Sequence, residues 1–314
     1  MGVTMLTLAR FTLKGPYQAA SVIAMLAVLA VFVPLILPWP EFGLFLATVF
    51  TMVSCVLVGL IILTQGTLSG LRVIAVSVVG ITLIGWAVVA RPELGFWTAM
   101  VQWLPVVVLA QTLRSSRSLS LTIMIAVGVA ILAIAMQYGF WGNLETELVD
   151  QALLNMRGSE NLQPEFVEQN VRLVRLFVVA LISMAFLIMM LVVLTARWLQ
   201  AGIAGSDGFG QEFRSLVLGK QAALVALAVV LLSIWLGQTW LNSIAILVTI
   251  AFMFQGIAIV HSRLAKKKQA GFLFGLFYVL LLIVPQVVAI TAIIGIIDNW
   301  LVFRKNAENH NNLS

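Results

Sequence analysis

Residues 42–64, FGLFLATVFTMVSCVLVGLIILT, decide the fold class, because they hold no charged side chain over a length that can cross a bilayer. A transmembrane helix needs about 20 apolar residues. Lipid offers backbone groups no hydrogen-bond partners, so such a run must be helical. Cys55, the only cysteine, lies in this run and is interpreted as a small apolar packing residue that cannot form an internal disulfide.

The same test selects further apolar runs on both sides of this one. They are Tyr17–Leu37, Leu71–Ala90, Leu94–Leu113, Leu119–Phe140, Leu173–Leu199, Leu216–Leu236, Trp240–Val260 and Ala270–Ile297. Of the 314 residues only 10% are charged, whereas soluble domains have about 25%. The sequence therefore predicts an all-α, polytopic helical membrane protein with about nine transmembrane helices, forming a single membrane domain over residues 1–305.

The last of these runs is ambiguous because it is too long. From Ala270 to Phe303 it is nearly unbroken and contains Pro285. As one helix it would extend about 50 Å, against a hydrocarbon core of about 30 Å. We prefer one span kinked near Pro285. A span followed by an interfacial segment, or two short helices that return the C-terminus to the cytoplasm, are the alternatives.

Basic residues at the ends of the runs set the predicted orientation. With a cytoplasmic N-terminus, 12 of the 18 Lys and Arg residues fall inside and 6 outside, as the positive-inside rule requires. Arg10 and Lys14 precede the first run, no small-residue cleavage site follows it, and we expect a retained span. We predict a multi-pass protein of the bacterial cytoplasmic (inner) membrane, with the lipid bilayer and no nucleic acid as partner.

Three polar stretches interrupt or follow the apolar runs. Residues 141–171 are acidic, and apolar residues at helical spacing predict an outer amphipathic segment, or alternatively a lid over a pocket that opens outward. Residues 200–215 are predicted as a cytoplasmic loop with a short surface helix, and residues 306–314 as a disordered tail.

Motifs for chemistry are missing from the sequence. No charged residue lies near the middle of a confident span, and there is no GxxxxGK[ST], HExxH or GxSxG motif. Two histidines and one cysteine are too few for a multi-ligand metal site. His261 is interpreted as an interfacial anchor. We expect no enzymatic activity, no cofactor, no metal and no energy source of its own.

Uncharged polar residues within the runs are the candidate binding groups, because each needs a partner in lipid. They are Gln102, Gln111, Gln137, Asn242, Gln255, Gln286 and Thr291. We predict that Gln102, Gln137, Gln255 and Gln286 line a solute cavity; hydrogen bonding between helices is the alternative. In the 200–215 loop, the predicted partner-contact residues are Phe209, Gly210, Glu212, Phe213 and Arg214, with structural anchoring as the alternative.

Several stretches resemble the YybS-like family of bacterial membrane proteins, whose function is unknown. The residues are Leu8-Ala9-Arg10 through Gly15, Gln18 and Ala19; Ala196-Arg197-Trp198 through Gly208–Phe213; and Val260-His261 with Tyr278, Pro285-Gln286 and Asp298–Arg304. Relatives usually carry ARWWQ followed by NPGGFGQEF, and end on DxWxDFR. Here Leu199 replaces the second Trp, Ser206-Asp207 replaces Asn-Pro, and Val302 replaces the second Asp.

The family is distantly similar to the S subunits of energy-coupling-factor transporters, which bind a small molecule from outside and dock on an ATPase module. That resemblance implies a solute-binding role beside another membrane subunit or an ATPase module, although fold does not fix function. Our first hypothesis is therefore binding or transport of a small, weakly charged solute. The second is a non-transporting membrane scaffold or assembly factor.

Overall fold

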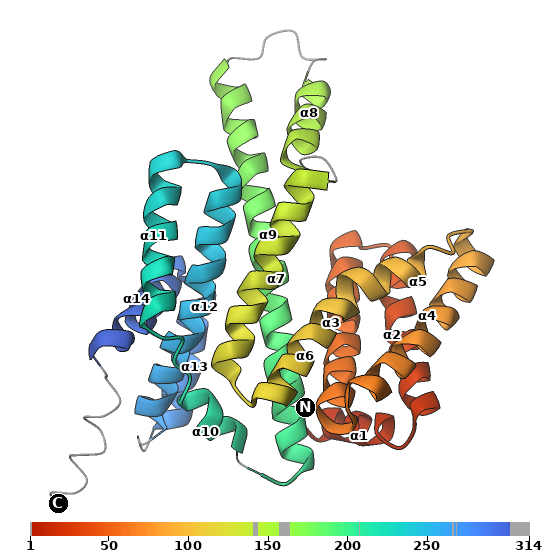
Figure 1. The fold of residues 1–314 in the computed structure, drawn as a ribbon. Helices are drawn as coiled ribbons and strands as arrows, with labels where there is room; N and C mark the ends of the chain where they lie inside the picture. The colour runs from red at the N-terminus through yellow and green to blue at the C-terminus, as the bar shows by residue number, and fades with distance from the viewer. Residues whose placement is uncertain are drawn as a thin grey trace, which may run out of the picture. The chain divides into compact units, whose positions relative to one another are not determined.

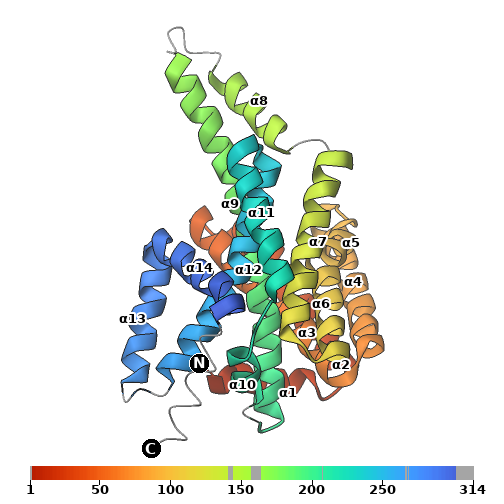
Figure 2. The same ribbon diagram turned by 60° about the vertical axis from the view of Figure 1, so that its left-hand side comes forward.

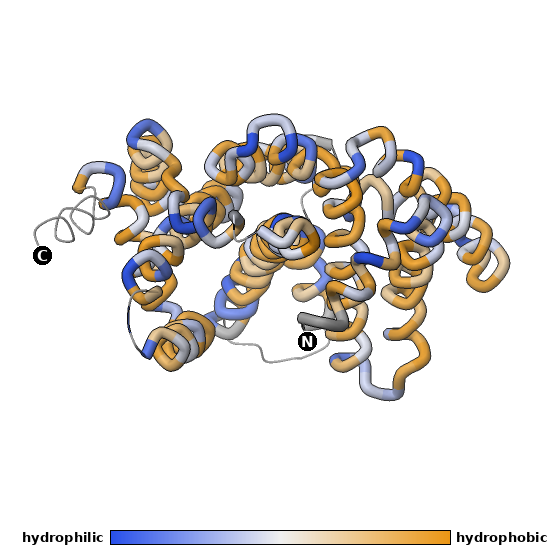
Figure 3. Tube along the Cα trace, turned by 90° about the horizontal axis from the view of Figure 1, so that it is seen from below, coloured by the Kyte–Doolittle hydropathy of each residue, from blue (hydrophilic) through white to orange (hydrophobic). Residues whose placement is uncertain are grey.

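The computed structural model of the chain describes residues 2–140, 144–156, 164–206, 208–265, 267 and 269–301. Every regular element in these ranges is a helix (Figure 1). Apolar residues dominate the helices, and hydrophilic stretches of the trace are short (Figure 3). The all-α class and the membrane character predicted from the sequence are therefore confirmed. The predicted tail 306–314 lies outside the described residues.

The helices fall into two compact units, residues 1–125 with 188–212 and residues 126–187 with 213–314. In chain order they are α1 (Gly2–Thr12), α2 (Pro16–Ile36), α3 (Pro40–Gln65), α4 (Thr67–Val89), α5 (Leu94–Trp97), the π-helical turn η1 (Thr98–Trp103), α6 (Leu104–Ser116), α7 (Leu119–Phe140), α8 (Leu144–Met156), α9 (Pro164–Ile203), α10 (Gly208–Arg214), α11 (Lys220–Leu236), α12 (Thr239–Leu264), α13 (Ala270–Ile283) and α14 (Pro285–Leu301). Two of them, α7 and α9, have one part in each unit.

The first unit is built around α3. This helix packs against α2, α4 and α6, and all residues from Ser54 to Leu63 are buried. A helix that is apolar on every side is expected at the centre of a bundle. Ser54 is satisfied there because its hydroxyl accepts a hydrogen bond from the indole N–H of Trp103 at 3.1 Å.

The second unit is built around α12, which packs against α11, α13 and α14. The contact with α14 is a close approach of two backbones. A Cβ atom on Gly256 would lie 1.9 Å from the Thr291 carbonyl oxygen, and one on Gly295 would lie 2.1 Å from that of Phe252. Only glycine fits at both positions, and small residues commonly allow such contacts between membrane helices.

By length and composition, seven helices of the described chain can each cross a membrane: α2, α3, α4, α5 to α6, α7, α9 and α12. Of the two other predicted spans, α11 is apolar but has only 17 residues. The final run is divided into α13 and α14. Each of the nine predicted runs thus contains a helix. The described chain has seven helices that can cross a membrane, or eight if α13 and α14 together form one span, so a multi-pass protein is supported and the count of nine stays a prediction.

The final run is bent by 112° at Val284 (Figure 2). The break falls directly before Pro285, as predicted, because proline disfavours the helical conformation of the residue before it. Val284 is extended at φ −113° and ψ 99°. A bend of this size exceeds an ordinary helix kink, so residues 270–301 form a broken span or a re-entrant pair and not one continuous helix.

The two polar stretches 141–171 and 200–215 contain more helix than the sequence predicted. Within 141–171, the predicted helical spacing corresponds to α8, and Pro164 opens α9. With 40 residues, α9 is about 60 Å long, so its N-terminal part extends the sixth predicted span. Within 200–215, α9 continues to Ile203 and the short helix α10 follows.

Candidate functional site

The second unit contains a cavity of about 650 Å³ between α9, α11 and α12. Small-molecule sites typically have volumes of about 300–1,000 Å³. Its lining is Glu168, Val171, Arg172, Arg175, Leu176 and Val179 on α9, Val230 and Ser233 on α11, Gly237 in the following turn, and Thr239, Asn242, Ala245, Ile246 and Thr249 on α12. We call it the α9/α11/α12 pocket.

The pocket extends along α12. Thr239, beside the α11–α12 turn, begins the lining on this helix, and Thr249 ends it, a rise of about 15 Å. Apolar groups such as Ala245 and Val179 lie between seven residues with hydrogen-bonding side chains. Since half of the lining residues are polar or charged, the pocket suits a small molecule with polar groups of its own.

Asn242 is the polar group of the pocket with most to gain from a ligand. It is half-buried, and no hydrogen bond joins its side-chain amide to another group in the part of the chain that the structure describes. Other polar groups here are already engaged: Ser233 donates to the Val230 carbonyl oxygen and Thr249 to that of Ala245. An amide in lipid needs a partner, so Asn242 is available to one in the cavity.

A single carboxylate on α8 holds the pocket wall. Glu145 accepts from the Arg175 Nε at 2.9 Å, from the Thr239 hydroxyl at 3.0 Å and from the Tyr138 hydroxyl at 3.3 Å. Its side chain is 13% exposed. Since these partners lie on α9, α12 and α7, this one residue joins four helices of the second unit. The acidic 141–171 segment therefore contributes a positioning residue beside the pocket.

The predicted cavity glutamines do not meet in one place. Gln102 lies in η1 of the first unit, and the other three are in the second. Gln286 is exposed at the start of α14. None of the four lines the α9/α11/α12 pocket, and none is hydrogen-bonded to another among the described residues.

Gln255 instead belongs to a buried polar cluster. Its Oε1 accepts from the Leu218 backbone N–H at 2.9 Å, and its Nε2 donates to the Asp298 Oδ2 at 3.2 Å. Asn299 accepts from the Gly219 N–H at 2.9 Å. The cluster caps the chain where it enters α11, since the N–H groups before a helix have no partner within it. Gln255 therefore has a structural role, which was the alternative to cavity lining.

The predicted partner-contact residues lie on α10 and at its end, and all five are half-buried. Glu212 forms an ion pair with Arg197 at 2.8 Å. The Phe213 ring packs edge-on against His261, with ring centroids 5.8 Å apart. Both side chains thus serve contacts within the chain, which supports the structural anchoring that was the alternative.

His261 lies in an aromatic cluster at the end of α12. Its ring stacks on Phe274 with centroids 4.4 Å apart, and its Nε2 is 2.7 Å from the Tyr278 hydroxyl. This environment fits the predicted anchor. Sequence reasoning identified Asn242 only as one of several polar residues, and it missed Arg172 and Arg175 as pocket residues. No periodic signal connects α9 with α12, because their proximity is a tertiary feature.

No protein-family model, curated protein or solved structure matched the chain in our comparisons. The resemblance to the YybS-like family accordingly stays a prediction, and any statement of function depends on the geometry described above.

Proposed function

We propose that this chain is a solute-binding membrane protein that takes a small, weakly charged or zwitterionic molecule into the α9/α11/α12 pocket. The observation that carries the proposal is the cavity of about 650 Å³ with Asn242 in its wall. A closely packed scaffold has no need of such a space. The role agrees with the one implied by the resemblance to transporter S subunits.

The charges around the pocket favour a solute of low net charge. Arg175 is neutralised by Glu145. Among the described residues, Glu168 and Arg172 form no ion pair, and they bring one charge of each sign to the lining. A solute with one cationic and one anionic group could therefore pair with both of these side chains, and one with neutral polar groups could form hydrogen bonds with them.

Further parts of the proposal follow from the sequence. About nine spans, a cytoplasmic N-terminus and location in the bacterial cytoplasmic membrane would put the α11–α12 turn, and hence this pocket, on the outer side. The chain lacks a nucleotide-binding motif, so another subunit or an ATPase module would supply energy for transport. The unassigned solute would enter from outside.

Filling the cavity tests the proposal. The full chain is purified in native lipid, and co-purified small molecules are identified by mass spectrometry. Wild type should carry an enriched small molecule. Ala245→Phe, which places a ring in the space, and Asn242→Leu, which removes the amide, should each carry at least about tenfold less of this molecule than wild type. A tenfold loss corresponds to about 1.4 kcal/mol, which is the size of one lost hydrogen bond.

Ala228→Phe is the matched control, because Ala228 is exposed on α11 and does not line the pocket. This variant should keep the molecule. The proposal fails if wild type and Ala228→Phe carry no enriched small molecule, or if Ala245→Phe retains the same molecule at the same level.

A further inference from the structure

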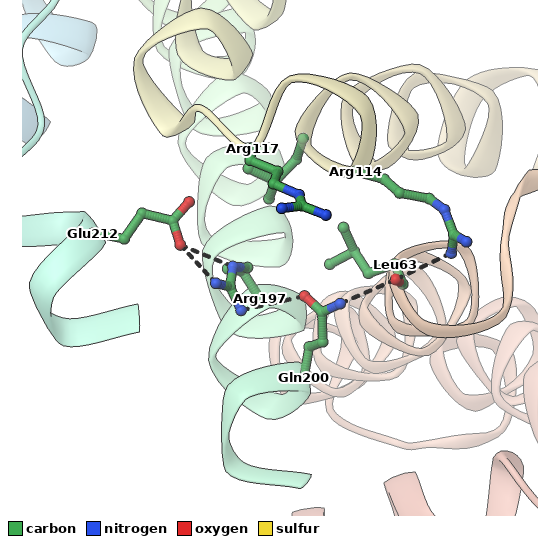
Figure 4. A pocket seen from close by; sticks show the side chains of 7 residues that line it. Leu63, Arg114, Arg117, Arg197, Gln200 and Glu212 are labelled. Carbon is green, nitrogen blue, oxygen red and sulfur yellow. Dashed lines mark hydrogen bonds and ion pairs between the residues drawn. The ribbon is translucent and has the colours of Figure 1, made fainter. Parts of the chain in front are cut away.

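The first unit contains a second cavity, of about 350 Å³, with a different chemistry (Figure 4). Its lining is Leu63, Leu113, Arg114, Arg117, Arg197, Gln200 and Glu212. We call it the arginine pocket. Three guanidinium groups facing one cavity are unusual in a chain with only 10% charged residues, and they decide which ligands can enter.

Two of the polar side chains are fixed by the end of α3. The Arg114 Nη1 donates to the carbonyl oxygens of Ile62 and Leu63, at 2.8 and 3.1 Å. The Gln200 Nε2 donates to the Leu63 oxygen at 3.0 Å. These carbonyls lie near the end of the helix, and that of Ile62 also accepts from the Gly66 backbone N–H at 3.0 Å. Because Arg114 uses one nitrogen in this way, it keeps further N–H groups for a ligand.

Arg197 is fixed from the other side of the pocket. Its Nη2 and Nε contact the same Glu212 oxygen, at 2.8 and 2.9 Å, and its Nη1 is 3.3 Å from the Gln200 Oε1. The Arg197 and Glu212 side chains are 23% and 19% exposed. Arg197 is therefore held in one orientation before any ligand arrives, which lowers the entropy cost of binding.

Arg117, unlike Arg114 and Arg197, is not held by hydrogen bonds from its side chain to other residues of the pocket. Figure 4 shows its guanidinium directed toward the space between Arg197 and Arg114. In the described ranges of the chain, its side chain forms no hydrogen bond or ion pair. Its backbone is left-handed, at φ 52°, a conformation in which asparagine or glycine is much more common than arginine. This backbone ends α6, and the Arg117 N–H donates to the Leu113 carbonyl oxygen at 2.9 Å.

The charge of the lining is not balanced. Glu212 neutralises one arginine, so two positive charges remain over Arg114 and Arg117. Planar guanidinium groups bind phosphate through paired N–H bonds. We propose that the arginine pocket binds a phosphate group, held by Arg117 and Arg114 and oriented by Arg197 with Gln200.

The location leaves two sources for that phosphate. Arg117 lies between the ends of two predicted spans, α6 and α7, and Gln200 lies near the end of α9. The pocket is therefore at the level where a bilayer has its headgroups. A phospholipid headgroup and a soluble phosphate compound offer the same chemistry, and the experiment separates them.

The experiment has two arms, both with the purified full chain. In the first, inorganic phosphate is titrated onto the protein in a neutral detergent by calorimetry. In the second, native mass spectrometry measures retention of phosphatidylglycerol, with phosphatidylcholine as the competing lipid. Wild type should bind in at least one arm. Arg117→Asn should bind at least about tenfold more weakly in that arm, as expected for one lost charge-assisted contact.

Arg117→Asn preserves the local backbone, since asparagine tolerates the left-handed conformation. Its melting temperature should equal or exceed that of wild type, which separates lost binding from misfolding. Arg91→Gln is the matched control: it removes an exposed arginine whose partner is Glu93, outside the pocket, and should bind as wild type does.

Each outcome decides the proposal. Binding of inorganic phosphate identifies a soluble ligand, and retention of phosphatidylglycerol alone identifies a headgroup. The proposal is overturned if wild type binds in neither arm, or if Arg117→Asn and Arg91→Gln bind equally well.

Discussion

At the scale of single residues, Gln255 and Gln286 illustrate how one residue type takes different roles within apolar helices. Gln255 is fully buried and serves both the Leu218 backbone N–H and the Asp298 carboxylate. Gln286 is exposed beside Pro285. The sequence gives no reason to distinguish the two glutamines. Only the tertiary structure shows that Gln255 has a structural role and that Gln286 lies on the surface.

We expect Gln255→Leu to lower stability by about 1–3 kcal/mol, because it leaves a buried N–H and a buried carboxylate oxygen without that partner. Gln286→Leu should change stability by less than about 0.5 kcal/mol, as most surface substitutions do. Unfolding in detergent, followed by circular dichroism, measures both. Equal stability of the two variants would contradict the structural role of Gln255.

Gly256 gives a second prediction. A methyl group at this position meets the Thr291 carbonyl oxygen, so Gly256→Ala must separate α12 from α14 and should cost about 1–3 kcal/mol. Gly275→Ala on α13 is the matched control, since a Cβ there meets nothing within 4 Å. The melting temperature of the first variant should fall by at least about 2 °C, and that of the control should not fall.

Glu212 predicts a dependence on pH. Burial raises the pKa of Glu212 above its ordinary value of 4.5, although Arg197 opposes this. The folded protein therefore holds this proton more tightly than the unfolded chain, and the resulting stabilisation is present below 4.5 and is lost as the pH rises through the folded pKa. The melting temperature of wild type minus that of Glu212→Gln should thus decrease from about pH 4 to about pH 7. An increase would contradict burial as the dominant cause.

The residues of the candidate sites were the least predictable part. Arg117 and Arg197 were recognised as basic residues at the ends of spans, which explains their position along the membrane normal. Hydropathy contains no information on which helices are neighbours. The convergence of Arg117 with Arg197, and of Arg172 with Asn242, depends on packing between residues distant in the sequence, so it could not be derived from spacing.

At the scale of elements, most helices were predictable and their ends were not. The apolar run Phe42–Thr64 corresponds to α3 within two residues at its start and one at its end, because Pro40 begins the helix and Gly66 ends it at φ 100°. The 40-residue α9 was underestimated, since its first turns are polar and extend beyond the apolar run. Pro285 located the break before α14, but the angle is set by the packing of α14 on α12.

The bend between α13 and α14 gives a distance that can be measured. Residues Phe272 and Ile293 are exposed and 21 positions apart. With a bend of 112°, their backbones should be about 18 Å apart, whereas an unbroken helix would separate them by about 31 Å. Spin labels at both positions, in a Cys55→Ala background, measure this distance by electron paramagnetic resonance.

Labels at Leu68 and Val89 provide the control, since both residues are exposed and lie 21 positions apart on the unbroken α4. This pair should give about 31 Å. A similar distance for the Phe272–Ile293 pair would show that the final run is straight.

At the scale of the whole molecule, the bilayer accounts for the exposed apolar surface. Side chains such as Leu282, Trp235 and Ile234 are at least 76% exposed, which would be costly in water at about 25 cal/mol per Å² of apolar area. Composition predicted this environment correctly. It does not determine how many helices cross the bilayer or in which direction they run.

Orientation can be tested because the chain has one cysteine, and it is buried. In a Cys55→Ala background, a cysteine at Glu93 should react with a membrane-impermeant maleimide in intact cells, because the positive-inside rule puts the α4–α5 connection outside. A cysteine at the exposed Ser115 should react only after lysis. The reverse pattern would show that the N-terminus is outside.

The close approach of α12 and α14 has a consequence for biogenesis. Translation makes α14 after every other helix of the second unit, so the face of α12 around Gly256 stays uncovered until then. A nascent or truncated chain that stops before Pro285 lacks Asp298 and Asn299, so it presents the Gln255 Nε2 and the Gly219 N–H without these acceptors. Such a chain displays unpaired polar groups in an apolar environment, which is costly until α14 packs against α12.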